Sequence, residues 1–492
     1  MSSSESFTRG ILADTSTMRE VEALARRAQE QLARSEHGAA LESLATALRL
    51  APQLDVLWAQ FGELIRFFNL RHPVPAFVRE LLARSLDHPA VDPGDLVRPV
   101  STLALSHPDG PLAEPLLLRL MEDTVIRDPR LELAITAARR RMREDETAVA
   151  IAHQCFNTEY VFDESPQEVR QLSPQRPVAY AAYRPLHTLG AVQVPASLQR
   201  RQIDEPLQER RLAATIPALT GVQSDVSAAV QAQYEENPYP RWIRAQATFP
   251  QFTAAAKKIL VAGCGTGQHA IATARYFPGA EVLAVDLSRA SLAYAKRKTI
   301  ELGIANIEYR QADILALGGL AERFDLIECS GVLHHLEHPL EGWRVLVSLL
   351  KPGGSMRIGL YSELGRRSVV AARALIAERG WRPDAEGIRA CRAAIRADPR
   401  FAAIAANEDF YSMSGCRDLL FHVQEHRFTL PQIEAMLAEL KLEFLGFEFA
   451  DSGAALRRYG ERYSDPRNLR HWHELEQQYP DTFSRMYQFW VR

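Results

Sequence analysis

The stretch KKILVAGCGTG, Lys257 to Gly267, decides the fold of this chain. Its apolar run ends in glycines that alternate with other residues, at Gly263, Gly265 and Gly267. An apolar run bounded by glycine is typical of a buried parallel strand that feeds a tight turn. Residues 268–277 then carry apolar positions at helical spacing. A turn without side chains lets the backbone approach a bound nucleotide, and the first amides of the helix offer donors to it. The stretch therefore predicts a nucleotide site between a strand and a helix.

The same alternation of strand and helix continues to residue 361. The second strand, EVLAVDL at 281–287, ends in Asp286, about 20 residues beyond the glycines, where a doubly wound fold places the group that accepts from ribose hydroxyls. A third strand ends at Asp313, a fourth, FDLIECS, ends at Ser330, and the turn KPGG precedes a fifth, SMRIGLY. This order predicts a parallel sheet with its ligand at the carboxyl edge.

Together, VAGCGTG, Asp286, Asp313, FDLIECSGVLHHL and LKPGG resemble the class I S-adenosylmethionine-dependent methyltransferases, especially the branch of ubiquinone-biosynthesis and related small-molecule enzymes. The likeness covers residues 257–361 and implies S-adenosyl-L-methionine as the cofactor. It also implies a Rossmann-like, mostly parallel sheet of seven strands, with MYQFWVR at the chain end as an antiparallel strand between the fifth and the sixth. A nicotinamide-dependent dehydrogenase is the weaker alternative, because the spacing is GxGxG and not GxGxxG.

The resemblance assigns the cofactor site residue by residue. The glycines would lie under the methionine and ribose, Asp286 would hold the ribose, and Asp313 with Ile314 would meet the adenine. The cofactor-binding set is Gly263, Cys264, Gly265, Gly267, Asp286, Leu287, Asp313, Ile314 and Ser330. One departure is Ala262, where the family usually has an acidic residue. It leaves a second class of function open, a cofactor-binding interaction module with weak activity.

Methyl transfer from a sulfonium depends mainly on positioning, and a base is needed only when the acceptor arrives protonated. His334 and His335 follow the fourth strand at the active edge, and a neutral imidazole suits that task. With Tyr361 they form the predicted catalytic set, although one histidine of the pair can equally serve packing. No metal site is predicted, since the cysteines are scattered.

The segment QYEENPYPRW, 233–242, precedes the glycine strand, and its two prolines stop any helix. It is either a rigid linker or a lid whose side chains close over a ligand. Asn237-Pro238-Tyr239 also resembles the loop of DNA adenine methyltransferases, a less favoured alternative. A second polar and aromatic stretch, 409–428, includes Asp409, Ser412, Asp418 and Glu425 among its candidates. The predicted substrate or lid residues are Tyr234, Asn237, Tyr239, Arg241, Trp242, Tyr411, Arg417 and His422.

The N-terminal half reads as helices. Small residues such as Ala28, Ala40 and Gly62, with Trp58, resemble the tetratricopeptide repeat of roughly 34 residues. This region would help to bind a protein or peptide substrate or a partner, while its aromatic clusters fit either a peptide groove or helix core. The expected units are a tail at 1–16, a helical domain at 17–225, a lid or hinge at 226–250, and a methyltransferase domain at 251–492 with a helical insertion at about 363–424.

Composition limits the function classes. The 492 residues suggest two or three domains, and 47% apolar with 24% charged residues is ordinary for a folded chain. A net charge of -3 gives no general attraction to nucleic acid or anionic lipid. The scattered cysteines, a start that lacks the features of a secretion signal, and the lack of an apolar run of ~20 residues lead us to expect a cytoplasmic protein without a membrane segment. The acceptor, protein or small molecule, stays open.

Overall fold

The structure is a computed structural model that describes residues 15–141, 145–244, 256–449, 452–483 and 486–492. The predicted tail at 1–16 therefore lies almost entirely outside the described residues. The same holds for 245–250, the end of the predicted hinge, and for 251–255, the predicted start of the sheet domain.

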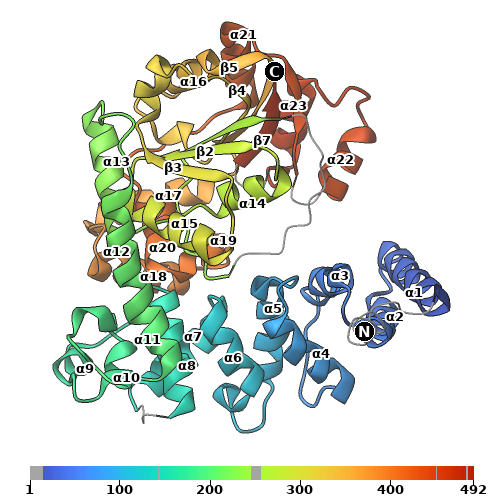
Figure 1. The fold of residues 1–492 in the computed structure, drawn as a ribbon, viewed down its shortest axis with the longest axis vertical. Coiled ribbons are helices and arrows are strands. Elements are labelled where there is room, and N and C mark those ends of the chain that lie inside the picture. The colour runs from blue at the N-terminus through green and yellow to red at the C-terminus, as the bar shows by residue number, and fades with distance from the viewer. Residues whose placement is uncertain (1–14, 142–144, 245–255, 450–451, 484–485) are drawn as a thin grey trace, which may run out of the picture.

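A seven-stranded sheet in the order β3-β2-β1-β4-β5-β7-β6 forms the centre of the C-terminal half (Figure 1). Strands β1 to β5 run parallel, and β7 is antiparallel to both β5 and β6. The strands are β1 Lys258–Ala262, β2 Glu281–Asp286, β3 Ile307–Gln311, β4 Phe324–Ser330, β5 Leu350–Tyr361, β6 Phe444–Phe447 and β7 Met486–Val491. The predicted sheet and the placement of its last strand are confirmed. The KPGG segment differs from the prediction, because it lies inside β5 and not ahead of it.

Helices cover both faces of the sheet and bury its apolar strand residues. Leu260, Ile327 and Ile358 are fully buried because parallel strands are covered on two sides. The helices of this half are α14 Gln268–Tyr276, α15 Arg289–Glu301, α16 Pro339–Ser348, α21 Leu430–Leu440, α22 Ser452–Gly460 and α23 Leu469–Gln478. Helix α21 begins with a capping box between Thr429 and Gln432, which satisfies backbone donors at its first turn.

The N-terminal half is helical, as predicted, and Figure 1 shows it extending away from the sheet and returning to it along α12 and α13. Its longer helices are α1 Thr15–Ala33, α2 His37–Leu50, α3 Asp55–Ile65, α4 Ala76–Asp87, α5 Pro93–Leu105, α6 Pro115–Asp123, α7 Pro129–Arg139, α8 Glu146–Asn157, α12 Glu205–Thr215 and α13 Asp225–Glu236. Short helices α9 Pro166–Arg170, α10 Pro177–Ala181 and α11 Ala196–Gln199 lie between them. Trp58 and Ala40 are fully buried between α2 and α3, which fits close packing of paired helices.

The helical insertion packs with the N-terminal helices. It consists of α17 Arg367–Arg379, α18 Ala385–Ala397, α19 Ala402–Ala405 and α20 Met413–Phe421. Figure 1 shows these orange helices between the sheet and the N-terminal region, and their buried residues belong to the same hydrophobic cluster as α2 to α8. The buried Arg392 of α18 pairs with the buried Glu132 of α7 at 2.8 Å. Two segments more than 200 residues apart in sequence thus share one core.

The structure also bears on membrane-spanning segments and on the state of the cysteines. Among the helices that the structure describes, none combines the length and apolar character needed to cross a bilayer. All five cysteines are buried and unpaired by disulfides.

Candidate active site

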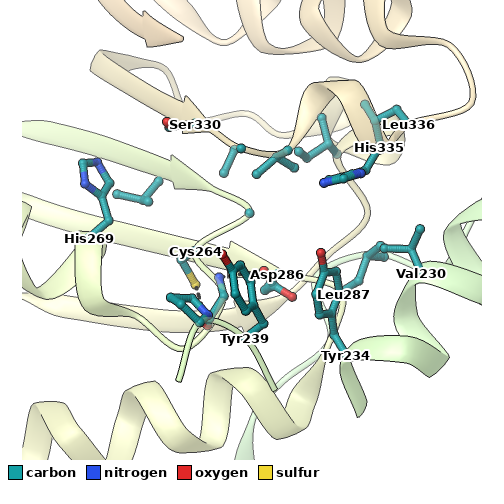
Figure 2. Close-up of a pocket in the computed structure, with 18 of the residues that line it drawn as sticks. Val230, Tyr234, Tyr239, Cys264, His269, Asp286, Leu287, Ser330, His335 and Leu336 are labelled. Atoms are coloured by element: carbon teal, nitrogen blue, oxygen red, sulfur yellow. Dashed lines mark hydrogen bonds between the residues drawn. The ribbon is translucent and has the colours of Figure 1, made fainter. Parts of the chain in front are cut away.

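A cavity of about 350 Å³ opens at the carboxyl edge of the sheet (Figure 2). Its walls come from the glycine turn, the ends of β2 to β5, strand β7, and helices α13 and α20. The sequence predicted twelve of the residues that line it: Tyr234, Tyr239, Gly263, Cys264, Gly265, Asp286, Leu287, Asp313, Ile314, Ser330, His335 and Tyr361.

The glycine turn after β1 forms part of the cavity wall. Gly263 and Gly265 have φ angles of 75° and 52°, which side chains rarely tolerate. A Cβ at Gly263 would lie 2.3 Å from Cγ2 of Val332, and one at Gly265 would lie 2.5 Å from the backbone oxygen of Tyr239. The turn is therefore closed against its neighbours by direct contact, and glycine is required at both positions.

Asp286, at the end of β2, anchors this turn. Its Oδ2 accepts from the backbone N–H of Gly265 at 2.8 Å, and its Oδ1 accepts from that of Ser288 at 2.9 Å. Each oxygen keeps a second lone pair for a ligand. Burial raises the pKa of Asp286, and the two backbone donors act in the opposite direction. Paired acceptors beside a glycine turn suit the two hydroxyls of a ribose.

Asp313 closes the cavity at the end of β3. Its carboxylate accepts from the backbone N–H of Leu315 and from that of Gln223, each at 3.0 Å. The segment before α13 thereby lies against β3, and Val230 of α13 joins Ile314 in an apolar wall. This arrangement offers a flat base an apolar surface with a carboxylate at its rim.

A charged cluster stands near Ala262, and two of its members, His269 and Arg357, line the cavity. His269 of α14 contacts Oε2 of Glu328 through its Nε2 at 3.0 Å, and Nη1 of Arg357 lies 3.3 Å from the same nitrogen. Glu328 stands on β4 in register with Val261 of β1. Burial raises the pKa of Glu328, but His269, the hydrogen bond from Thr273 and the cation of Arg357 together hold it below its usual value. Glu328 thus adds a carboxylate on the neighbouring strand, beside the cavity wall, and Arg357 is in addition paired with Glu448 at 2.7 Å.

His335, in the short turn after β4, points into the cavity from the side opposite Tyr234 (Figure 2). Its Nδ1 lies 2.7 Å from the backbone oxygen of Gln424. Because a carbonyl only accepts, Nδ1 carries the proton and Nε2 keeps its lone pair. Burial lowers the pKa of His335 to about 4. At neutral pH this side chain is therefore an uncharged hydrogen-bond acceptor.

Asp418 of α20 ends a hydrogen-bonded chain beside His335. The backbone N–H of Gln424 donates to Nδ1 of His422, so Nε2 of His422 carries the proton and donates to the hydroxyl oxygen of Tyr234 at 3.1 Å. Tyr234 in turn donates to Oδ1 of Asp418 at 2.6 Å. Burial raises the pKa of Asp418 to about 7. The His422 ring stacks on that of His335 at 3.6 Å between centroids.

His335, Asp418 and His422 also offer nitrogen and oxygen atoms within 4.8 Å of one another, the spacing of a cation site. The hydrogen bonds argue against that use. Both ring nitrogens of His422 are engaged, one as an acceptor and one as a donor, and only His335 and Asp418 keep free lone pairs. Since a zinc site takes at least three protein ligands, this trio does not fit one.

Several predicted hinge residues pack elsewhere. Trp242 donates to Thr266 and contacts the ring of Tyr294, and Arg241 is buried over the ring of Phe156. Asn237 accepts from the guanidinium of Arg417, the other predicted member of this pair. Of the five hinge residues predicted to contact a substrate, Tyr234 and Tyr239 line the cavity, whereas Asn237, Arg241 and Trp242 secure the segment against α14, α15 and α20.

Four further predicted residues also lie outside the cavity lining. His334 is fully buried with its ring stacked on Tyr361 at 3.8 Å, so this histidine supports the site by packing. Tyr411 lies in the core shared with the N-terminal helices. Gly267 lies under α15, where a Cβ would meet Ala295 at 2.5 Å. His422 acts through Tyr234, as described above.

Other residues of the cavity wall were not among those predicted from the sequence. They include Ser227 and Val230 of α13, His269 of α14, Arg357 of β5, and Met486 and Gln488 of β7. A signal for the last two existed in the sequence. Residues 486, 488 and 490 share one face of a strand, so placing the strand next to β5 brings two of them to the cavity.

Comparisons with known proteins agree with this geometry. Residues 259–354 match a family model described as a methyltransferase domain. The chain is 36% identical over 103 residues to a ubiquinone biosynthesis O-methyltransferase of Azotobacter vinelandii, covering 21% of this chain and 43% of that protein. It is 33% identical over 215 residues to an uncharacterized protein of a Synechococcus strain, covering 41% of this chain and 51% of that protein. The chain thus spans about half the length of the curated relatives it matches.

Among solved structures, PKMT2 of Rickettsia typhi in complex with AdoHcy superposes with a TM-score of 0.38 and 17% identity, covering 55% of this chain and 52% of that one. The matched stretch and the sheet order confirm that the C-terminal half contains a class I S-adenosylmethionine-dependent methyltransferase domain, with S-adenosylmethionine as its cofactor. The residues of the cavity fit that molecule: Asp286 suits the ribose, Ile314 and Asp313 suit the adenine, and Gly263 and Gly265 line the same cavity.

Proposed function

We propose that this chain is an S-adenosylmethionine-dependent methyltransferase whose acceptor enters the end of the cavity formed by His335, Tyr361 and Asp418. The main support for this proposal is that one cavity joins the residues suited to the nucleoside to a cluster of titratable side chains. Asp286 lies at one end, and the free Nε2 of His335 lies at the other. An interaction module would need the first end but not the second.

The cofactor supplies a methyl carbon that is already electrophilic, so the chain has to orient an acceptor and manage its proton. Nε2 of His335 accepts a hydrogen bond from the acceptor, and Asp418 is the stronger proton acceptor because its pKa, about 7, is matched to neutral pH. The rings of Tyr234, Tyr239 and Tyr361 exclude water from this end. Orientation of this kind is worth up to ~7–11 kcal/mol in well-ordered systems.

The cluster near Ala262 supports an active enzyme over a weakened one. An amino acid tail carries one positive and one negative charge. His269 and Arg357 line the cavity there and suit the negative group, and Arg357 is also paired with Glu448. Glu328, which contacts His269, adds a negative charge beside this wall without an acid at Ala262. We therefore assign the methionine part of the cofactor to this wall.

The adenine methyltransferase alternative is weaker. That reading requires the side chain of Asn237 to hold an amino group, and Asn237 is engaged by Arg417 outside the cavity lining. The helical N-terminal region has a different role in this proposal. By packing against α18 and α20 it positions Asp418, and it offers a surface that would aid binding of a substrate or a partner.

A labelling experiment tests the proposal. The full chain is incubated with S-adenosylmethionine carrying a tritiated methyl group and with fractions of a cell extract, and the product is separated from the cofactor. Transfer of label in at least one fraction is expected. Calorimetric binding of the cofactor without label in any fraction would instead favour the binding module.

A further inference from the structure

Asp418 differs from the other carboxylates of the cavity. Asp286 and Asp313 each accept two hydrogen bonds from backbone N–H groups. Asp418 is 4% exposed and accepts from the Tyr234 hydroxyl alone at Oδ1, and among the described residues no donor reaches Oδ2. This oxygen belongs to a side chain that lines the cavity. Buried carboxylate oxygens normally accept a hydrogen bond, so a donor on a bound ligand would satisfy Oδ2 of Asp418.

Nor does a cation of the described chain pair with Asp418. Arg366, whose charge acts on Asp418, pairs with Glu425 and stacks over the ring of Tyr361 at 3.9 Å. Arg373 is 3.6 Å from the same Glu425. Asp409, like Glu425, adds negative charge near Asp418 and helps to raise its pKa, of which burial is the main cause. The ionised form of Asp418 is favoured by the hydrogen bond from Tyr234 and by the charge of Arg366, but it has no ion-pair partner among the described residues, which is costly in a desolvated site.

The surroundings of Asp418 are suited to a positive ligand. Tyr234, Tyr239 and Tyr361 line the cavity with it, and the face of an aromatic ring attracts a cation. His335 is neutral near pH 7, because burial lowers its pKa to about 4, so it does not repel one. Its Nε2 can accept a second hydrogen from the same ligand.

We propose that the methyl acceptor is an amine, which enters the cavity as an ammonium ion and pairs with Asp418. This inference rests on the proposed methyltransferase function and names its substrate class. An alcohol would leave the charge of Asp418 uncompensated, and a carboxylate acceptor would add a second negative charge. A free amine and a lysine side chain present the same ammonium group.

The step balances without any further reagent. The carboxylate of Asp418 takes one proton from the ammonium group, and His335 holds a second N–H through Nε2. The nitrogen lone pair forms the N–C bond to the methyl carbon while the C–S bond breaks and leaves its electron pair on sulfur, which becomes a neutral thioether. The methylated product leaves as a cation, and Asp418 returns its proton to water.

Acetylation of the acceptor fractions tests the substrate class. A cell extract is divided into a macromolecular and a small-molecule fraction, and half of each is treated with acetic anhydride to block amines. All four samples are incubated with the full chain and methyl-tritiated S-adenosylmethionine. We expect label in the untreated half of one fraction, and its loss by at least tenfold after acetylation. Label in the macromolecular fraction identifies lysine or an N-terminus as the source, and label in the other fraction identifies a free amine.

A matched pair of variants tests the residue. Asp418→Asn keeps an acceptor for Tyr234 but removes the charge, and we expect kcat/KM for the labelled fraction to fall about 100-fold while the Kd for S-adenosylmethionine changes less than twofold. Asp384→Asn makes the same substitution at a partly exposed helix cap in the same insertion, outside the cavity lining, and should leave kcat/KM unchanged.

Two results would overturn the inference. Equal labelling of acetylated and untreated fractions would exclude an amine and leave the proposed function standing. Full activity of the Asp418→Asn variant would exclude ion pairing at this site. A chain that binds cofactor but labels no sample would contradict the proposed function, and with it the inference.

Discussion

The two ends of the cavity are built in different ways. The nucleoside end comes from one continuous stretch, 257–361, in which each strand delivers its residue to the same edge of the sheet. The acceptor end is assembled from α13, the turn after β4, the end of β5, and α20 of the insertion, which are up to 184 residues apart where Tyr234 meets Asp418. The comparison indicates that the first end is fixed by the local fold, whereas the second depends on how the helical region packs.

Replacement of His335 should impair catalysis at the acceptor end without affecting cofactor binding. For His335→Ala we expect a loss of about 100-fold or more in kcat, because the variant loses the group that orients the acceptor. The Kd for S-adenosylmethionine should change less than twofold by calorimetry. His338→Ala alters an exposed histidine three residues further on and should have no effect. If His335→Ala weakened cofactor binding by as large a factor as it lowers kcat, the two ends of the cavity would not be separable.

Removal of the buried cation at Arg392 tests how strongly the insertion is held to the N-terminal helices, the packing on which the acceptor end depends. The guanidinium pairs with Glu132 and also donates to the backbone oxygens of Phe410 and Val161. Arg392→Ala should lower the free energy of unfolding by about 3 kcal/mol, since it leaves buried acceptors unpaired. Chemical denaturation measures this. The surface variant Arg400→Ala should unfold as the parent does, and an equal effect of both would contradict the assigned role.

Replacement of Asp286 should break the nucleoside end. Asp286→Ala removes the expected acceptor of the ribose hydroxyls and the anchor of Gly265, so we expect the Kd for S-adenosylmethionine to rise about 10- to 100-fold. Asp286→Asn, which keeps one acceptor oxygen, should fall between the parent and the alanine variant. Unchanged calorimetric affinity in both would place the cofactor elsewhere.

The pH dependence of the free energy of unfolding tests whether the Asp418 carboxylate at the acceptor end is destabilised by burial. Its pKa is raised from 3.8 to about 7 on folding, so the native state binds a proton more tightly than the unfolded state. Stability from this group is present below the unfolded pKa and is lost as pH rises toward 7, by up to about 1.4 kcal/mol per pH unit. Asp418→Asn should lack this slope between pH 5 and 7 in thermal unfolding. Parallel curves for parent and variant would show that the carboxylate is already compensated.

Predictions from the sequence were most accurate where the same short stretch of residues both forms the strands and turns and contributes the side chains of the site. The spacing of Gly263, Gly265 and Asp286 follows from the geometry of a strand, a turn and a second strand, so order and role could be predicted together. Adjacent residues proved harder. His334 and His335 look alike in sequence, and only the turn after β4 decides that one ring enters the cavity while the other packs under Tyr361.

Tertiary packing decided the residues that sequence reasoning could not place. Trp242 and Arg241 have the composition of a lid, yet they pack against α14 and α15, because buried aromatic contacts outweigh local preference. Asp418 was one of several polar candidates on α20. It reaches the cavity because the opposite side of α20 is held in the core of the N-terminal helices, a contact that no local pattern records.

The placement of the cofactor is tested most directly by a crystal structure of the full chain with S-adenosylhomocysteine. The account predicts both ribose hydroxyls within hydrogen-bond distance of Asp286, the adenine beside Ile314, and the sulfur facing His335 and Tyr361. A ligand bound away from the glycine turn, or with Asp286 directed away from the ribose, would contradict it.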